Sequence, residues 1–235
     1  MTGGWDESAA AWIASMGERG DWGREFVLDA PMLSEARALS PRSAVDIGCG
    51  EGRFCRMLKA GGVATVGVDP TQALIDEARR RDPAGDYRIG RAEALALPDA
   101  AFDLAVSYLS LIDIEHAAQA IGEMARVLRP GGALLVAHVN AFTTAAEPTA
   151  WRRDLTGALR YTLDDYLDIR ATEIAWKGIR IVNWHRPLSF YFKAFFAAGF
   201  DLKLFDEPEP QGGGADKIAK YRRAPHFCVM RWEKR

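Results

Sequence analysis

The segment that most restricts how this chain can fold is Val45–Phe54, where a short apolar run gives way to closely spaced glycines. The run that begins at Val45 is typical of a buried strand, and the residues from Arg53 onward favour a helix. The glycines occupy alternate positions, at Gly48, Gly50 and Gly52. Glycine permits positive φ angles and lets a ligand lie against the main chain, and the N–H groups at the start of the helix face the same turn. We therefore predict a strand, a ligand-binding turn and a helix in succession.

A second apolar run, at residues 63–68, ends at Asp69-Pro70. An acid at the end of the second strand, roughly 20 residues past a glycine turn, is placed to accept hydrogen bonds from ribose hydroxyls. The two strands and the helix between them thus predict a nucleoside-containing ligand, either a dinucleotide or S-adenosylmethionine. Arg53 stands where the dinucleotide fingerprint has its third glycine, so the turn is a poor fit to a pyrophosphate.

Four segments, in order, resemble the motifs of class I S-adenosylmethionine-dependent methyltransferases. They are Val45–Phe54, Val66–Arg79, Ala92–Ser107 and Met124–Ala137. The resemblance covers about residues 40–140 of the 235 in the chain. It implies S-adenosyl-L-methionine as the cofactor and an α/β, Rossmann-like fold with a seven-stranded, mostly parallel sheet. It also implies helices on both faces of the sheet, an N-terminal helical segment and an insertion after strand five.

We expect four regions along the chain. These are an N-terminal helical cap at 1–40, a cofactor-binding core at 41–138, a substrate-cap insertion at 139–187 and the C-terminal part of the core at 188–235. In the core, strands are expected at 44–48, 63–68, 86–89, 102–107 and 133–138, and helices at 53–60, 71–81 and 115–128. Rough alternation around Lys177-Gly178 predicts a hairpin over 173–187. A helix to about residue 198, a strand at 200–205 and a last strand at 225–232 should follow, the last one antiparallel beside strand five.

Ligands in open parallel sheets bind past the carboxyl ends of the strands, which brings several predicted turns around one crevice. These turns contain Gly48–Gly52 with Cys49 among them, Asp69-Pro70, Ala92-Glu93 and Ser107-Tyr108. The resemblance assigns Asp69 to the ribose hydroxyls, the Ala92 backbone N–H to an adenine nitrogen, and Asp46 to the turn or, through water, to the methionine ammonium group. Relatives often have an acid directly before this alanine, but here it is Arg91. Either Glu93 supplies the contact with the adenine amino group, or nothing does.

The segment before strand one closes over the cofactor in similar methyltransferases. By that resemblance Trp22 covers the ligand and Arg24 pairs with the methionine carboxylate, a partner that a guanidinium binds with two parallel hydrogen bonds. The alternative is a solvated loop with one buried tryptophan.

Candidate catalytic residues follow strand four and end the insertion. Tyr108 and Asp113 lie where relatives contact the cofactor sulfur and the nucleophile, although Asp113 could instead cap the helix at 115–128. His185 lies where the insertion returns to the sheet, and it either takes a proton from the acceptor or forms structural hydrogen bonds. The aromatic residues of the insertion either line a substrate pocket or attach the insertion to the core. They are Trp151, Tyr161, Tyr166, Trp176 and Trp184.

Composition argues against several classes of partner. A net charge of −2 gives no general attraction to nucleic acid or to an anionic membrane. No apolar run approaches the ~18 residues of a membrane span, and residues 1–7 do not resemble a secretory signal. The three cysteines show no metal-type or redox-type spacing. We therefore expect a cytoplasmic protein with reduced thiols and no metal.

The expected function is methyl transfer to an O or N atom of a small, aromatic or apolar molecule, by a monomer or homodimer. No conspicuous catalytic triad is needed, because alignment of the reactants supplies much of the acceleration in such a transfer. The alternatives are an RNA or protein methyltransferase, and a protein that binds the cofactor without catalysis. A nicotinamide-dependent oxidoreductase is a more distant alternative.

Overall fold

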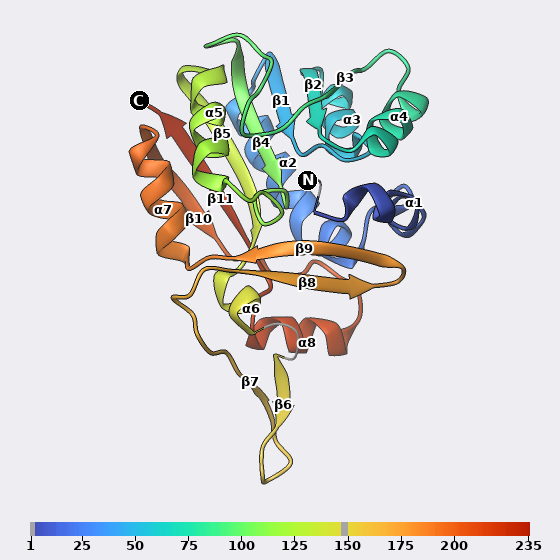
Figure 1. Cartoon of the computed structure of the whole chain (residues 1–235), viewed down its shortest axis with the longest axis vertical. Helices are drawn as coiled ribbons and strands as arrows, with labels where there is room; N and C mark the ends of the chain where they lie inside the picture. The colour runs from blue at the N-terminus through green and yellow to red at the C-terminus, as the bar shows by residue number, and fades with distance from the viewer. Residues whose placement is uncertain (1–2, 147–149) are drawn as a thin grey trace.

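The computed structural model describes residues 3–146 and 150–235 around a seven-stranded sheet (Figure 1). The strand order is β10-β11-β5-β4-β1-β2-β3. The strands are β1 (Ser43–Ile47), β2 (Ala64–Asp69), β3 (Asp86–Ile89), β4 (Phe102–Tyr108), β5 (Leu128–Val139), β10 (Phe200–Asp206) and β11 (Phe227–Lys234). β11 is antiparallel to both β5 and β10, and the other neighbours are parallel. The predicted α/β, mostly parallel fold is confirmed, as is the antiparallel last strand beside strand five.

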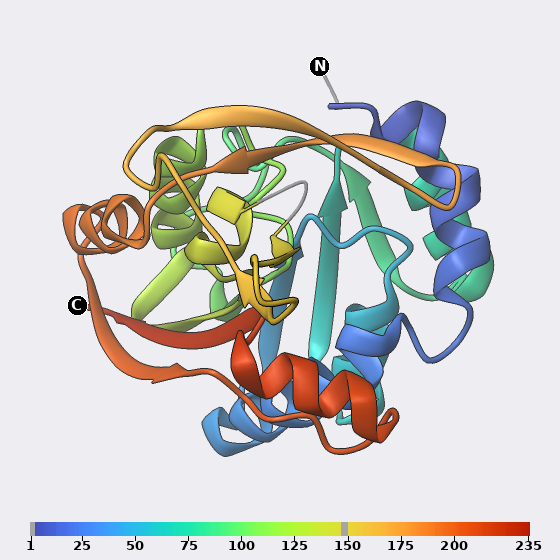
Figure 2. The ribbon, with the colours of Figure 1, turned by 90° about the horizontal axis from the view of Figure 1, so that it is seen from below.

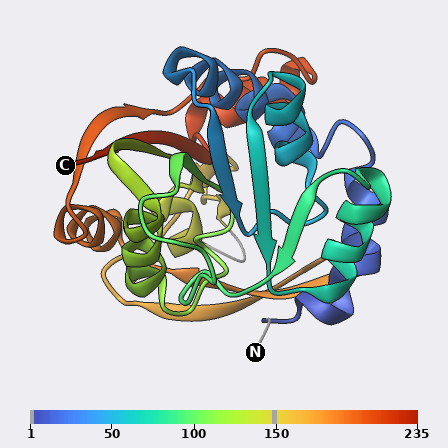
Figure 3. The same ribbon diagram turned by 90° about the horizontal axis from the view of Figure 1, so that it is seen from above.

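Helices cover both faces of this sheet (Figure 3). They are α2 (Asp29–Leu39) and α3 (Arg53–Ala60) on one face, α5 (Ala117–Val127) and α7 (Leu188–Ala197) on the other, and α4 (Gln72–Arg81) against β2 and β3. Neighbouring residues of one strand point to opposite faces of the sheet and pack in different cores. Ala44 packs in the core that contains α2 and α3, and Val45 in the core that contains α5 and α7. Burial on both faces is why the parallel strands appear in the sequence as apolar runs rather than as alternating patterns.

The insertion after β5 contains more structure than the sequence predicted. It comprises α6 (Ala141–Ala146), a hairpin of β6 (Trp151–Arg153) with β7 (Leu159–Tyr161), and a hairpin of β8 (Arg170–Trp176) with β9 (Ile179–His185). The turn at Lys177-Gly178 is confirmed, and both residues have positive φ, 47° and 82°. Strands β6 and β7 have only three residues each, which is too short for a recognisable alternation. Their hairpin projects away from the rest of the molecule (Figure 1).

The N-terminal helix α1 (Trp5–Met16) and the β8–β9 hairpin together cover the carboxyl edge of the sheet (Figure 2). Backbone and side-chain hydrogen bonds join them. The Val182 N–H donates to the Gly3 carbonyl at 2.8 Å, and the Ser8 hydroxyl donates to the Arg180 carbonyl at 2.9 Å. A short π-helix (Arg24–Leu28) and then α2 and α8 (Ala215–Arg223) complete the fold. Among the described residues, no helix has the length and apolar composition needed to cross a membrane.

Candidate active site

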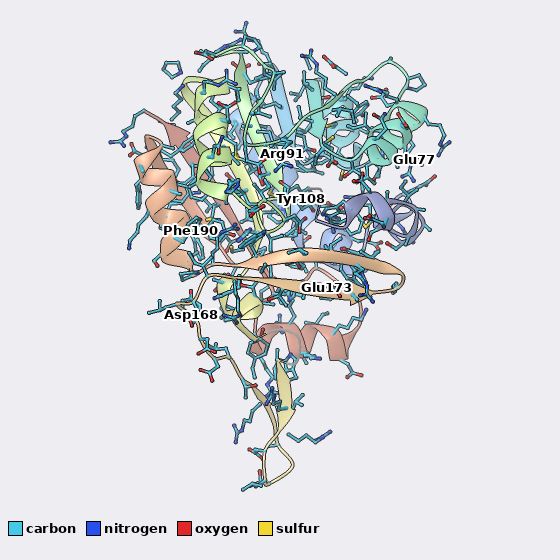
Figure 4. The ribbon with its side chains drawn as sticks, viewed as in Figure 1. Glu77, Arg91, Tyr108, Asp168, Glu173 and Phe190 are labelled. Atoms are coloured by element: carbon cyan, nitrogen blue, oxygen red, sulfur yellow. The ribbon has the colours of Figure 1, made fainter. Side chains whose placement is uncertain are left out.

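A cavity of about 860 Å³ lies between the carboxyl edge of the sheet, α1 and the β8–β9 hairpin. It forms where the strand order reverses, because β1 connects toward β2 on one side and β4 toward β5 on the other. Figure 4 shows Arg91 and Tyr108 on the core side of this space and Glu173 on the hairpin opposite. Its volume lies near the upper end of the ~300–1,000 Å³ typical of ligand pockets, which leaves room for a cofactor and a second small molecule.

The glycine turn forms one wall of this cavity. Gly48 and Gly50 both line it and have positive φ, 78° and 55°. A Cβ on Gly48 would lie 2.3 Å from the Cβ of Ser110, so the turn also approaches the loop after β4 too closely for any side chain. The N–H groups of Gly48 and Cys49 donate to the Val68 carbonyl at 2.8 and 3.1 Å, which holds the turn against the end of β2.

Asp69 stands beside the turn at the end of β2 and faces the same cavity. Its two carboxylate oxygens accept the N–H groups of Gly50 at 3.0 Å and Thr71 at 2.9 Å. Burial raises the pKa of this carboxyl, and the two backbone hydrogen bonds act in the opposite direction. A carboxylate has about four lone-pair sites, so two bonds to the backbone leave acceptor capacity for hydroxyl groups in the cavity.

Asp46 and Cys49 lie behind the turn rather than on the main cavity. Both line a smaller cavity of about 60 Å³, whose wall includes Arg24 and both cavity glycines. The Cys55 thiol donates to Oδ2 of Asp46 at 3.6 Å, whereas Oδ1 has no hydrogen-bond partner among the described residues. Burial raises the pKa of this carboxyl to about 7. An unsatisfied buried oxygen of this kind indicates a place for a polar ligand atom or a water molecule.

Arg24 lines both cavities and its guanidinium is held in place from several sides. It lies 4.9 Å from the centre of the Trp12 ring and 5.6 Å from that of Tyr108, and it donates to the Asp21 carboxylate at 2.6 Å. The other N–H groups of this fork are available for an anionic group near the turn.

The opposite end of the cavity follows β3. Pro70, Leu74 and the segment from Gly90 to Glu93 line it. Arg91 donates to the Glu93 carboxylate at 2.8 Å, so the residue that replaces the usual acid is paired with the acid that follows Ala92. This end is therefore lined by apolar side chains and backbone together with one ion pair.

The two catalytic candidates after β4 both reach the cavity but are held differently. The Tyr108 hydroxyl donates to Asp29 at 2.7 Å, and burial raises its pKa well above the usual range. The phenol is thus neutral, and its hydroxyl hydrogen is already donated to Asp29. Asp113 accepts hydrogen bonds from the Asn183 amide of β9 and from the indole of Trp5, while burial raises its pKa to about 8.

Asp113 does not cap the following helix. That helix, α5, begins at Ala117, and its N-cap residue is His116 without a side-chain hydrogen bond. The carboxylate is instead directed toward the insertion, and the capping alternative is corrected. Asn183 and Trp5 were not among the predicted site residues, and their contacts depend on chain segments far apart in the sequence.

Besides Asp46 and Cys49, three predicted site residues lie outside the main cavity, and these three line neither cavity. The Trp22 indole donates to the Gly213 carbonyl at 2.9 Å and packs beside Tyr221, so it covers α8 rather than the ligand space. Ser107 is fully buried, with its hydroxyl 2.7 Å from that of Ser110. His185 is also buried, with Nε2 2.9 Å from the Tyr166 carbonyl. These placements correct the expectation that all three surround the ligands.

Most aromatic side chains of the insertion also lie outside the cavity. Of the five, only Trp184 lines the cavity. Trp151 packs edge-on against Tyr161 in the projecting hairpin, and Trp176 is exposed. The tryptophan rings that line the cavity with Trp184 are Trp5 and Trp12 of α1. Their helical spacing was visible in the sequence, but it also fits a helix packed on a core.

His185→Ala is expected to lower the free energy of unfolding by about 1–3 kcal/mol, because it removes two hydrogen bonds of a buried side chain. These bonds join Nε2 to the Tyr166 carbonyl and Nδ1 to the Thr144 hydroxyl, which keeps the Ala141 carbonyl as a partner at 3.0 Å. Urea unfolding would measure this loss, and turnover per folded molecule should stay at the wild-type value. A normal unfolding curve with turnover reduced tenfold or more would instead return His185 to the catalytic residues.

Comparisons with known proteins agree with this geometry. The family model of the methyltransferase domain matches residues 45–136. The chain is 32% identical over 167 residues to a malonyl-[acyl-carrier protein] O-methyltransferase from Serratia marcescens, covering 60% of this chain and 65% of the relative. It is 31% identical over 181 residues to the enzyme of the same name from Pseudescherichia vulneris, covering 73% and 67%. The matched regions thus span between half and two thirds of the first curated relatives.

A solved S-adenosylmethionine-dependent methyltransferase from Mesorhizobium loti matches 93% of this chain and 100% of its own, with a TM-score of 0.78 and 26% identity. The residues of this chain fit that cofactor. The bare glycine turn, the carboxylate of Asp69 beside it and the unpartnered oxygen of Asp46 are the groups that a nucleoside with an amino-acid tail requires. The chain belongs to the class I S-adenosylmethionine-dependent methyltransferases.

Proposed function

We propose that this methyltransferase acts on an O or N atom of a small molecule, which binds between Asp113 and the β8–β9 hairpin. The observation that carries the proposal is the single cavity of about 860 Å³ in which the glycine turn, Asp69, Asp113 and the hairpin meet. Cofactor and acceptor would share one covered compartment. Its remaining space suits a small molecule better than a folded RNA or protein surface.

Several residues would hold the cofactor in this arrangement. Asp69 would accept the ribose hydroxyls, the Ala92 segment would receive the adenine, and Arg24 would bind the carboxylate of the methionine part. When bound, S-adenosyl-L-methionine supplies an electrophilic methyl group on a positively charged sulfur. The chain supplies alignment of the acceptor and exclusion of water, and both effects accelerate a transfer of this kind.

Asp113 is the candidate general base, because it reaches the cavity from the loop after β4 and also accepts a hydrogen bond from Asn183 of the hairpin. Its raised pKa, about 8, is close to the operating range in which a general base works best. The Asn183 amide and the Trp5 indole fix its orientation. Tyr108 contributes its ring to the wall, with its hydroxyl bound to Asp29.

Asp69→Ala is expected to weaken cofactor binding by about 1–3 kcal/mol, the scale of a lost hydrogen bond to a charged group. The same change also frees the N–H groups of Gly50 and Thr71, which Asp69 holds at 3.0 and 2.9 Å. Calorimetry with S-adenosylhomocysteine would measure the loss, and Asp201→Asn on the distant β10 provides a carboxylate control. Equal affinities for the wild type and Asp69→Ala would refute the ribose assignment.

Methyl-labelled cofactor tests the proposed function directly. The protein would be incubated with separate small-molecule, RNA and protein fractions of a cell extract, and each fraction would be counted for label. We expect label in the small-molecule fraction. Label confined to RNA or to a protein, including a carrier protein, would contradict the proposal. Tight cofactor binding without label in any fraction would favour a non-catalytic binding protein.

A further inference from the structure

The wall of the cavity is strongly acidic for a site that must hold a second molecule. It contains seven carboxyl groups and three guanidinium groups. The carboxyl groups belong to Asp6, Glu7, Asp69, Glu93, Asp113, Glu115 and Glu173. The whole chain, by contrast, has a net charge of only −2. The carboxyl groups outnumber the guanidinium groups in this wall even when Asp113, whose pKa is about 8, is counted as neutral at pH 7.

Each of the three arginines in the wall has a carboxylate partner. Arg24 pairs with Asp21 at 2.6 Å, Arg91 with Glu93 at 2.8 Å and Arg180 with Glu173 at 2.9 Å. Of the three carboxylate partners, only Asp21 lies outside the wall, so the arginines do not offset the whole negative charge of the wall. A cleft lined mainly by one sign of charge concentrates ligands of the opposite sign.

The carboxyl groups come from several elements around the cavity. Asp69 and Glu93 follow β2 and β3 at the nucleoside end. The others come from α1, from the loop after β4 and from β8. They are Asp6, Glu7, Asp113, Glu115 and Glu173. Besides burial, the charge of Asp6 raises the pKa of Asp69, so Asp6 of α1 lies near that carboxyl. The cationic side chains near these groups are Arg180, which is paired with Glu173, and Arg24, which lies over Trp12.

Three tryptophan rings line the same cavity, and Trp12 lies beside the glycine turn at Gly50. Trp5 and Trp12 meet edge to face on α1, with ring centres 5.0 Å apart, and Trp184 lies on β9. These rings already bind cations within the protein. The Arg24 guanidinium lies over Trp12 at 4.9 Å, and that of Arg186 lies over Trp184 at 5.1 Å. Aromatic faces beside carboxylates are a common way to recognise an organic cation.

We propose that the methyl acceptor is a cationic amine, recognised by carboxylates and tryptophan rings of the cavity wall and methylated on nitrogen. This inference rests on the proposed function and narrows its acceptor class. An ammonium group has no lone pair, so a proton must first pass to the Asp113 carboxylate. The nitrogen lone pair then forms the N–C bond as the methyl–sulfur bond breaks, and the electron pair of that bond stays on sulfur. The proton leaves Asp113 to solvent, and the product is a methylated amine.

Binding of three matched probes to the full-length protein tests the acceptor class. The probes are 2-phenylethylamine, 2-phenylethanol and 3-phenylpropanoate, which share the phenyl ring and differ in the polar group. Affinity would be measured by calorimetry with the protein saturated by S-adenosylhomocysteine. We expect the amine to bind at least tenfold more tightly than either of the others, and its affinity to fall as salt is added.

A charge-removal variant provides the second measurement. Glu7→Gln combined with Glu173→Gln should reduce the preference for the amine over the alcohol severalfold, because both side chains lie in the wall. Glu209→Gln is the control. Glu209 pairs with Arg222 away from the cavity, so its replacement removes a carboxylate but should leave the preference as in the wild type.

The acceptor class is overturned if the alcohol or the carboxylate binds as tightly as the amine, if none of the probes binds, or if the double variant keeps the full preference. Labelled methyl transfer distinguishes this from failure of the proposed function. Label in an alcohol or acid of the small-molecule fraction would refute an amine as the methyl acceptor and leave small-molecule transfer intact. A clear amine preference with label only in RNA or protein would contradict small-molecule transfer and leave the preference of the cavity for amines intact.

Discussion

Gly48→Ala is expected to abolish measurable cofactor binding and to lower the free energy of unfolding by about 2–4 kcal/mol. Two costs combine at this position. Its φ of 78° is unfavourable for any residue with a Cβ, and the new Cβ would lie 2.3 Å from the Cβ of Ser110. Ser110 has little freedom to move, because its hydroxyl donates to the Ile47 carbonyl at 2.6 Å. The turn would have to shift away from its place beside Asp69, where the cofactor is expected to bind.

Gly62→Ala is the matched control for this change. Gly62 has a similar φ of 86°, but no atom lies within 4 Å of the Cβ position, so only the conformational cost of about 1 kcal/mol applies. Adding Ser110→Gly to Gly48→Ala should recover part of the stability, because it removes the clashing Cβ. Urea unfolding and calorimetry with S-adenosylhomocysteine measure both effects. The steric account fails if the alanines at 48 and 62 behave alike.

The strand–turn–helix around Gly48 and the position of Asp69 could be predicted from the sequence because they are local. The turn around Gly48 and the acid at Asp69 are each fixed by a strand end, and the register of β1 with β2 brings them together. The spacing of motifs along the chain therefore carried most of the spatial information. Helix α3 was predicted with the bounds that the structure shows, because the glycine turn sets its start.

The acceptor half was harder to predict because its contacts join distant segments. Asp113 meets Asn183 of β9 and Trp5 of α1, and no spacing rule relates these positions. His185 illustrates the opposite error. Its place at the end of the insertion suggested chemistry, but the chain directs the ring into the protein between Thr144 and Tyr166. Position along a chain shows where a residue enters the fold, but not which way its side chain points.

Asp113→Asn is expected to lower kcat by about 10²–10⁴-fold, the range for loss of a general base, with little change in cofactor affinity. The amide keeps the shape of the carboxyl but cannot accept the acceptor's proton. In the wild type, kcat/KM should rise with pH, with its midpoint near pH 8, the pKa of this carboxyl, and level off above it. The variant should lack that rise. Asp168→Asn, in an exposed part of the insertion (Figure 4), is the control and should keep the wild-type profile.

Asn183→Ala separates positioning from chemistry in the same experiment. The Asn183 amide donates to Asp113 and lowers its pKa, while burial and the charge of Asp69 raise it and the charge of Arg24 lowers it. Removing the amide should therefore move the rise in kcat/KM to higher pH without removing it. A variant that loses activity equally at every pH would show that Asn183 orients the acceptor rather than tuning the base.

Protein stability gives a test of Asp113 that does not depend on turnover. Its pKa rises from an ordinary 3.8 to about 8 on folding, so the folded protein binds more protons than the unfolded chain between these values. The contribution of Asp113 to stability is therefore greatest at low pH and is lost as the pH rises through that window. Asp113→Asn should flatten the pH dependence of the free energy of unfolding between pH 5 and about pH 8. Parallel wild-type and variant curves over that range would mean that Asp113 already ionises freely in the folded protein, and the argument for it as a base near neutral pH would fail with them.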